Sequence, residues 1–436
     1  NSLENKIDVI VLDHHQSEIE LPKAFSVVNP NRFDDSSKLN YLCAAGVCFM
    51  FLIALNKKLR DLEWFKKNHI QEPNLIDFLD LVSLGTVCDV VPLIGLNRAI
   101  VSQGLKIFNK FSNPGLKILK NICGIETNLN TYHLGYVLGP RINAGGRVGK
   151  CSHGANLLLS KDPKKVFIIA SELENFNKER KCIEKDMLAK IEKKIVVDPS
   201  EPVTVLSGHN WHGGVIGIIA SRLKDKFNKP TIIISISNGV GKASARSVHG
   251  FDIGTFVINA VQKNILIRGG GHKMAAGFSI KEEKIEEFKD FINKSFLKIK
   301  KDMNNNNEIF YDSIISPSAL NENFYDEINS LSPFGSGNPE PRFVIENLEI
   351  IKSSIVSEKH IKSVLAGDDG STVKSVTFNA VNTNLESYLL ANNRKKINIF
   401  GKLSLNKWKG KKNVEFIIDD ISVNKTIKKM VPSSNG

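Results

Sequence analysis

Three consecutive side chains that can bind metals follow directly on an apolar run near the start of the sequence. The run Ile7–Leu12 is mostly β-branched, and Asp13, His14 and His15 come after it without a spacer. Such a run is typical of a buried parallel strand, and open α/β sheets bind their ligands at the carboxyl ends of strands. Imidazole nitrogens bind divalent metals, and aspartate either binds the metal or orients an imidazole. The three residues therefore predict a metal site, with a strand end that carries exposed histidines as the alternative.

A second acidic residue could join this site. Asp89 lies within the apolar, strand-like segment Gly85–Leu93, where an unpaired carboxylate would be unfavourable. Two polar positions that are both associated with strands favour a shared divalent-metal centre. The alternative is that Asp89 caps the N-terminus of a helix or forms an ion pair.

Further segments combine glycine with basic or hydroxyl side chains that could contact phosphate groups. Glycine allows close approach of a backbone, and arginine binds phosphate through parallel hydrogen bonds. One such segment is Leu138–Gly149, for which a simple basic turn is the alternative. In the others, serine and arginine alternate with alanine on one strand face, and three glycines form a loop before a histidine. The candidate residues are Arg141, Asn143, Arg147, Ser244, Arg246, Gly270, Gly271 and His272.

The composition favours an anionic partner. The chain has 59 Lys and Arg residues against 46 Asp and Glu residues, a net charge of +13. This excess indicates nucleic acid or a phosphorylated ligand, unless it reflects only a lysine-rich proteome. None of the six cysteines forms a Cys-x-x-Cys pair, which predicts reduced, buried thiols in a cytoplasmic protein. The longest apolar run, Cys43–Leu55, is too short to span a bilayer.

Strands that alternate with helices predict an α/β domain with a parallel sheet in the first part of the chain. We expect strands at Ile7–Leu12, 25–30 and Gly85–Leu93, and helices around 39–59, 74–82, 97–110, 114–122 and 131–138. Residues 163–195 form one long charged stretch that predicts a connecting helix.

A second α/β pattern follows, and then a region of short strands. The second pattern has strands at 203–207, 230–236 and 241–247, and helices at 214–227, 252–263 and 281–298. A polar linker at 298–308 separates it from five short alternating strands after residue 330. Such strands with turn signals between them predict a small β-barrel of the oligonucleotide-binding (OB) type.

Taken in order, these segments resemble the RecJ family of single-strand-specific DNA exonucleases, within the DHH phosphoesterase superfamily. The resemblance covers nearly the whole chain and rests on the stretches LDHH, GTVCDVVPL, LGPRINAGGR, WHGGVIGIIASRL, GKASARS, GGGHKMAAGF and PFGSGNPEPRF. It implies an α/β fold with a parallel-sheet DHH domain, a DHH-associated substrate-binding domain and an OB barrel. The implied ranges are 1–162 for an N-terminally incomplete DHH domain, 163–195 for the connector helix, 196–300 for the second domain and 309–430 for the barrel.

The resemblance also implies a function, a 5′→3′ exonuclease of single-stranded DNA in repair and recombination that uses two-metal catalysis with Mn²⁺ or Mg²⁺. It makes His14 and Asp89 metal ligands, and it gives His15 and Asp13 catalytic roles, His15 facing the scissile phosphate and Asp13 supporting the site. The candidate residues of the glycine-rich segments would bind DNA, with Arg141, Ser244 and Arg246 holding phosphates that include the 5′-terminal one, and the two lobes would clamp one strand. The implied partners are single-stranded DNA and a single-strand-binding protein or helicase, for a cytoplasmic monomer.

The family pattern contains an upstream Asp-x-Asp segment that completes the two-metal centre, whereas twelve residues precede Asp13 here. We therefore expect residues 1–436 alone to show little exonuclease activity. Two other classes remain open. One is a DNA-binding fragment that has lost part of its metal site, and the other is a phosphodiesterase of short oligonucleotides or cyclic dinucleotides, against which the barrel and LGPRINAGGR argue.

Overall fold

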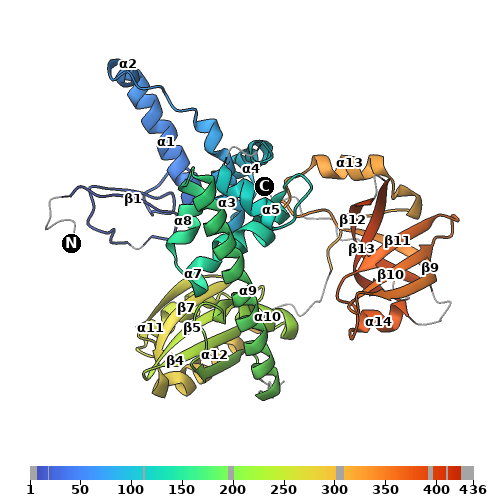
Figure 1. Cartoon of the computed structure of the whole chain (residues 1–436). Coiled ribbons are helices and arrows are strands. Elements are labelled where there is room, and N and C mark those ends of the chain that lie inside the picture. The colour runs from blue at the N-terminus through green and yellow to red at the C-terminus, as the bar shows by residue number, and fades with distance from the viewer. Residues whose placement is uncertain are drawn as a thin grey trace. The chain divides into compact units, whose positions relative to one another are not determined.

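The computed structural model of the chain describes residues 7–17, 19–110, 113–194, 201–300, 309–390, 396–408 and 411–423 (Figure 1). The chain divides into two compact units. Unit 1 combines Asn1–Lys106 with Asn307–Gly436, and unit 2 is Ile107–Asn306. Most of the linker predicted at 298–308 falls outside the described residues. The two compact units do not correspond to the four predicted domain ranges, since their division falls after residue 106, within the first range. The four ranges therefore stay a prediction.

A two-stranded parallel sheet lies near the start of unit 1. Strand β1 (Ile10–Leu12) pairs with β2 (Ser26–Val28), with Ile10 opposite Ser26. The backbone N–H of Asp13 donates to the carbonyl of Val28 at 3.0 Å, which extends the pairing one residue beyond β1. The first two predicted strands are therefore found, both shorter than expected. The predicted burial of the first is wrong, because Ile7 is 59% exposed and Ile10 is 49% exposed.

Helices make up the rest of this part of unit 1. They are α1 (Ala44–Asp61), α2 (Trp64–Lys67), the 3₁₀ turn η1 (Leu75–Phe78), α3 (Leu79–Cys88) and α4 (Gly95–Phe108), which crosses the division between the units. Buried Val47, Val82 and Val101 belong to the apolar core of these helices. Within the described ranges, no helix is both long enough and apolar enough to cross a membrane.

The strand predicted at Gly85–Leu93 is wrong, because residues 85–88 are the last turn of α3. A Cβ atom on Gly85 would lie 2.7 Å from the Cβ atom of Ala45, so the glycine allows α3 to pack closely against α1. The hydroxyl of Thr86 donates to the carbonyl of Val82 at 2.7 Å and stays within the helix. Helix packing therefore overrides the β-branched composition of this segment.

Unit 2 begins with short helices packed on one long helix. These are α5 (Pro114–Ile122), the π-helix η2 (His133–Leu138), α6 (Gly139–Ile142), α7 (Ala144–Val148) and α8 (Ser152–Leu159), and the long helix is α9 (Pro163–Lys194). A Cβ atom on Gly115 would lie 2.2 Å from the carbonyl oxygen of Leu157, so α5 and α8 also touch through a glycine. The segment Leu138–Gly149 is thus helical and not an open turn.

A five-stranded sheet forms the second half of unit 2. Its order is β3 (Thr204–His209), β4 (Thr231–Ser237), β5 (Val240–Arg246), β7 (Ala275–Lys281) and β6 (Arg268–His272), and only β3 and β4 run parallel. Helices α11 (Ile253–Gln262) and α12 (Ile285–Lys300) pack on the face that carries Ala245 and Phe278. Helix α10 (Ile216–Phe227) packs on the other face, against Ile233.

The glycine-rich loop predicted before His272 is wrong, because Gly269–His272 belong to the edge strand β6. A Cβ atom on Gly269 would lie 2.7 Å from both the Val257 and the Phe278 side chains, so β6 fits beside α11 only without side chains there. Its pairing with β7 puts Gly271 opposite Ala276, a contact that local sequence does not reveal.

The C-terminal part of unit 1 is a closed barrel. Its strands are β9 (Phe343–Val356), β10 (His360–Ala366), β11 (Thr372–Thr377), β12 (Ile397–Trp408) and β13 (Lys411–Ser422), and β9 pairs back with β10 to close it. Strand β8 (Ser313–Ile314) extends β9, and α13 (Glu322–Ser330) and α14 (Asn384–Leu389) flank the barrel. Buried Phe343, Leu365 and Phe416 fill its interior. The five strands predicted here and the OB-type barrel are confirmed.

The cysteines are free thiols, as predicted, but most are not buried. Only Cys43 is fully buried, whereas Cys151 and Cys182 are exposed. Cys151 precedes α8 and Cys182 lies on α9, so a helical context did not ensure burial.

Candidate functional site

His14 and Asp89 meet in unit 1, one from the end of β1 and the other from the end of α3. The Nε2 atom of His14 lies 3.5 Å from the Oδ2 atom of Asp89. Two atoms that are each about 2.1 Å from one ion, at a right angle, would be about 3 Å apart, so the pair fits two neighbouring ligands of a single ion. The His14 side chain is 16% exposed and that of Asp89 is 40% exposed, so solvent reaches the pair.

The carboxylate of Asp13 is occupied by local hydrogen bonds. Its Oδ1 atom accepts from the backbone N–H of His14 at 2.7 Å and of His15 at 3.2 Å, and lies 2.7 Å from Nδ1 of His15. Burial by itself would raise the pKa of Asp13, but these hydrogen bonds outweigh it and hold the pKa below its usual range. Asp13 therefore stays ionised and shapes the turn that orients the two imidazoles.

Two asparagines that the sequence interpretation missed hold the same turn. The Nδ2 group of Asn29 donates to the carbonyl of His15 at 2.8 Å, and that of Asn31 donates to the carbonyl of His14 at 2.7 Å. The Asn29 side chain also accepts from the backbone N–H of Asn31 at 2.8 Å. Both lie at or just beyond the end of the predicted strand 25–30, whose carboxyl end meets that of β1, and this neighbouring strand end was the signal that could have identified them.

The turn after Asp89 has a strained backbone, and a segment far along the chain, residues 333–338, packs against it. Val90 has φ +59°, a conformation that β-branched residues rarely adopt. The neighbouring backbone is fixed by the segment 333–338, because Leu93 donates its N–H to the carbonyl of Ser336 at 2.6 Å. Gly337, with φ +71°, lies so close to Pro92 that a Cβ atom would come within 2.9 Å of the Pro92 Cβ. Strain that is fixed by its surroundings is typical of functional positions, which supports a role for Asp89.

The chemistry of the pair fits part of a metal shell. An imidazole nitrogen beside a carboxylate oxygen suits Mn²⁺ better than Mg²⁺, which prefers oxygen ligands. Ions of this type take about six ligands. Among the residues that the structure describes, no group of three or more His, Cys, Asp or Glu side chains is placed to hold an ion. His14 and Asp89 would therefore share an ion with ligands from other sources, such as water and substrate oxygens.

An arginine cluster lies in unit 2, near the start of α10. The Nη1 group of Arg246 donates to the hydroxyl of Ser244 at 3.1 Å and to the carbonyl of Ala245 at 2.8 Å. The Nη1 group of Arg147 donates to the carbonyl of Gly214 at 3.0 Å. A Cβ atom on Gly217 would lie 3.0 Å from the Ser244 hydroxyl and 3.1 Å from Nη2 of Arg246, so the glycine allows α10 to approach both side chains closely.

The charges of this cluster are not neutralised within the described part of the chain. Burial lowers the pKa of Arg246, and the nearby charge of Arg147 lowers it further, with no carboxylate opposing them. An arginine remains protonated under such conditions. Two guanidinium groups beside a hydroxyl form a site that a phosphate would neutralise through charge-assisted hydrogen bonds.

Arg141 is bound within unit 2. Its Nε group donates to Glu174 of α9 at 2.5 Å, and its Nη1 group donates to the carbonyl of Val137 in the π-helix at 2.8 Å. Both members of the ion pair are 15% exposed. Arg141 thus joins η2 to α9 with its charge already compensated, while Asn143 is exposed. Their roles in DNA binding stay a prediction.

The edge strand β6 contributes to the sheet face that carries Ser244 and Arg246. The register places Gly270 level with Ser244 and His272 level with Arg246, across β7. Gly271 lies on the opposite face, where its carbonyl oxygen would be 2.8 Å from a Cβ atom on Gly254 of α11. The structure therefore brings Arg147, Ser244, Arg246, Gly270 and His272 to one side of unit 2, and Gly271 supports the strand from behind.

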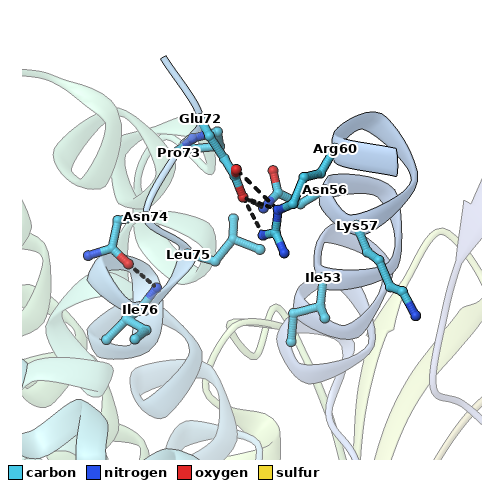
Figure 2. A pocket seen from close by; sticks show the side chains of 9 residues that line it. All are labelled: Ile53, Asn56, Lys57, Arg60, Glu72, Pro73, Asn74, Leu75 and Ile76. Carbon is cyan, nitrogen blue, oxygen red and sulfur yellow. Dashed lines mark hydrogen bonds and ion pairs between the residues drawn. The ribbon is translucent and has the colours of Figure 1, made fainter. Parts of the chain in front are cut away.

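A pocket of about 560 Å³ in unit 1 lies apart from these residues (Figure 2). It is lined by α1 and the segment before η1, and none of the described residues that line it is a predicted site residue. Its polar groups bind one another, because Glu72 pairs with Arg60 and accepts from Asn56 at 2.7 Å. This pairing joins α1 to the following segment, so the pocket has a structural explanation.

Comparison with known proteins identifies the family. The DHHA1 domain matches residues 200–298, and the RecJ OB domain matches residues 311–420. The single-stranded-DNA-specific exonuclease RecJ of Salmonella typhimurium is 34% identical over 426 residues, which cover 95% of this chain and 73% of the relative. The Escherichia coli protein of the same name is 32% identical over 434 residues, with the same coverage.

Solved structures agree with these matches. RecJ from Thermus thermophilus in complex with Mn²⁺ is similar with a TM-score of 0.81 and 28% identity, over 98% of this chain and 60% of the solved one. Its complex with Mg²⁺ gives a TM-score of 0.78 at 28% identity, over 97% and 61%. With this fold, the barrel and the extent of identity established, this chain belongs to the RecJ family of single-stranded-DNA-specific exonucleases.

Proposed function

We propose that this chain acts as a 5′→3′ exonuclease of single-stranded DNA in repair and recombination, by two-metal catalysis with Mn²⁺ or Mg²⁺. The observation that carries the proposal is the His14–Asp89 pair, 3.5 Å apart. His14 lies on a turn that Asp13 and two asparagines hold in place, and Asp89 lies at the end of α3. The relatives named as exonucleases and the solved relative with bound Mn²⁺ or Mg²⁺ support it. They do not favour the alternative of a DNA-binding fragment without catalysis.

The residues of the proposed metal site, Asp13, His14, His15 and Asp89, have distinct roles in this proposal. A divalent ion held there would polarise a phosphoryl oxygen and lower the pKa of bound water. His14 and Asp89 hold the ion, and Asp13 fixes the His15 ring through Nδ1. The His15 side chain is 68% exposed, which leaves Nε2 free to accept a proton from water or, when the ring is protonated, to donate to a phosphate oxygen.

The residues of unit 2 bind the strand in this proposal. Arg147, Ser244 and Arg246 hold the terminal 5′-phosphate, because two guanidinium groups and a hydroxyl lie near one another here and no carboxylate offsets the charge of Arg246. The barrel adds a further surface for a single strand, as OB folds commonly do. The family resemblance alone supports the wider proposal of a cytoplasmic monomer that meets a single-strand-binding protein or a helicase on its substrate.

The test follows a single-stranded oligonucleotide labelled at either end, in Mn²⁺, with the protein joined to the Asp-x-Asp segment that the family resemblance predicts upstream. We expect the 5′ label to be released first, and both His14→Ala and Asp89→Ala to abolish release while DNA binding persists. Release that begins at the 3′ end, or that survives both substitutions, would contradict the proposal.

A further inference from the structure

The sheet face that carries Ser244 and Arg246 also carries two further basic residues, Lys242 and Arg268. Lys242, two residues before Ser244, lies directly opposite Ser279 of β7, and Ser279 lies directly opposite Arg268 of β6. Residues that are directly opposite in a sheet share one face, so Lys242 and Arg268 stand on the same face as Ser244, on either side of β7.

This part of the face is open. Helix α10 covers β4, where Ile233 is buried, and the neighbouring part of β5, where Gly217 lies close to Ser244. Helices α11 and α12 pack on the other face of the sheet, and Lys242 stays exposed. A concavity of about 600 Å³ remains, lined by Lys242, Arg268, Gly277, Ser279 and their neighbours. The small side chain of Ser279 lies between the two cations, and Gly277, with no side chain, lies next to it on this face of β7.

The two cations have no acidic partner within the described part of the chain. Lys242 and Arg268 are both exposed, and neither forms an ion pair with a described residue. Neighbouring strands are about 4.8 Å apart, so the backbones of β5 and β6 are roughly 10 Å apart, with β7 between them. Two positive side chains over such a gap can reach one anion from both sides, which also removes their mutual repulsion.

We propose that Lys242 and Arg268 form a second phosphate subsite, which binds an internucleotide phosphate of a strand whose terminal phosphate lies at Ser244 and Arg246. Lys242 and Ser244 are two residues apart on β5, roughly 7 Å along the strand. This distance is comparable to the spacing of neighbouring phosphates in a single strand. The ligand class is the phosphodiester backbone of an oligonucleotide. This inference rests on the proposed function in one respect, namely that the ligand of unit 2 is nucleic acid.

The test measures binding, without divalent metal, as a function of salt. The probes are a 5′-phosphorylated oligothymidylate and thymidine 5′-monophosphate, and the variants are Lys242→Ala and Arg268→Ala. Each variant should weaken oligonucleotide binding about tenfold and reduce the slope of log affinity against log salt by about 0.7, the value for one lost contact to a single strand. Neither should change binding of the mononucleotide, which has no internucleotide phosphate.

Lys294→Ala is the matched control, because Lys294 is exposed on α12, which packs on the opposite face of the sheet. It should change neither affinity nor slope. Unchanged oligonucleotide binding by Lys242→Ala and Arg268→Ala would overturn the subsite, and so would an equal loss of mononucleotide binding. If Arg246→Ala weakens binding and these two variants do not, the proposed function stands and only the second subsite fails.

Discussion

Replacement of Arg246 by alanine tests how unit 2 recognises the end of a strand. Arg246 uses Nη1 for Ser244 and for the carbonyl of Ala245, which leaves its other nitrogens for a ligand. A charge-assisted hydrogen bond contributes about 1.5–3 kcal/mol, so we expect Arg246→Ala to weaken binding of a 5′-phosphorylated oligonucleotide about 10- to 140-fold. Loss of the side chain also removes the repulsion from Arg147, so the folded protein should not be destabilised.

The assay is fluorescence anisotropy with two oligonucleotides that differ only in a 5′-phosphate or 5′-hydroxyl group. Arg246→Ala should reduce affinity for the phosphorylated strand much more than for the hydroxyl strand. Arg246→Lys should lie between the wild type and Arg246→Ala, because lysine keeps the charge but loses the planar pair of donors. An identical loss for both oligonucleotides would refute the assignment of a terminal-phosphate site to this cluster.

Three further predictions concern stability and reactivity. Asn29→Ala should lower the free energy of unfolding by about 1–3 kcal/mol in urea denaturation, because it removes the hydrogen bond to the His15 carbonyl and the one accepted from the Asn31 backbone. No change would show that the turn is held by other contacts. Gly337→Ala should lower it by about 1–2 kcal/mol, because φ is +71° there, and unaltered stability would argue against the contact with Pro92. Burial raises the pKa of Cys88 to about 11, which keeps the thiol protonated below about pH 10, so iodoacetamide at pH 8 should label the exposed cysteines first in a mass-spectrometric time course. Equal labelling of Cys88 would contradict its burial.

The sequence predicted elements well where local pattern decides structure. The alternating strands of the barrel were identified because burial on one face leaves a direct trace in the order of residues. The run before Asp13 was identified as a strand from its β-branched residues, although none of the residues of β1 is buried. The segment around Asp89 was predicted as a strand, since its β-branched residues and glycine resemble one. Its helical form depends on the contact of Gly85 with Ala45, which lies 40 positions earlier in the chain and cannot be read locally.

The candidate site shows the same division. Residue types indicated metal and phosphate chemistry, and the structure brings His14 to Asp89 and Ser244 to Arg246. Sequence did not reveal that Arg141 is already paired with Glu174, because an ion pair between residues 33 positions apart leaves no pattern. It also did not reveal the positioning role of Asn29, whose partner lies on the neighbouring strand end.

Binding of Mn²⁺ by the protein, followed by electron paramagnetic resonance, tests the central claim that His14 and Asp89 hold a divalent metal. A histidine nitrogen bound to Mn²⁺ gives a nitrogen coupling in pulsed spectra, and this readout requires no catalysis. We predict that the wild type shows this coupling, that His14→Ala loses it, and that Asp89→Ala weakens Mn²⁺ binding. The control variant His69→Ala, at an exposed histidine outside this turn, should leave both unchanged. A nitrogen coupling that persists in His14→Ala, or Mn²⁺ affinity that is the same in all four proteins, would contradict this claim.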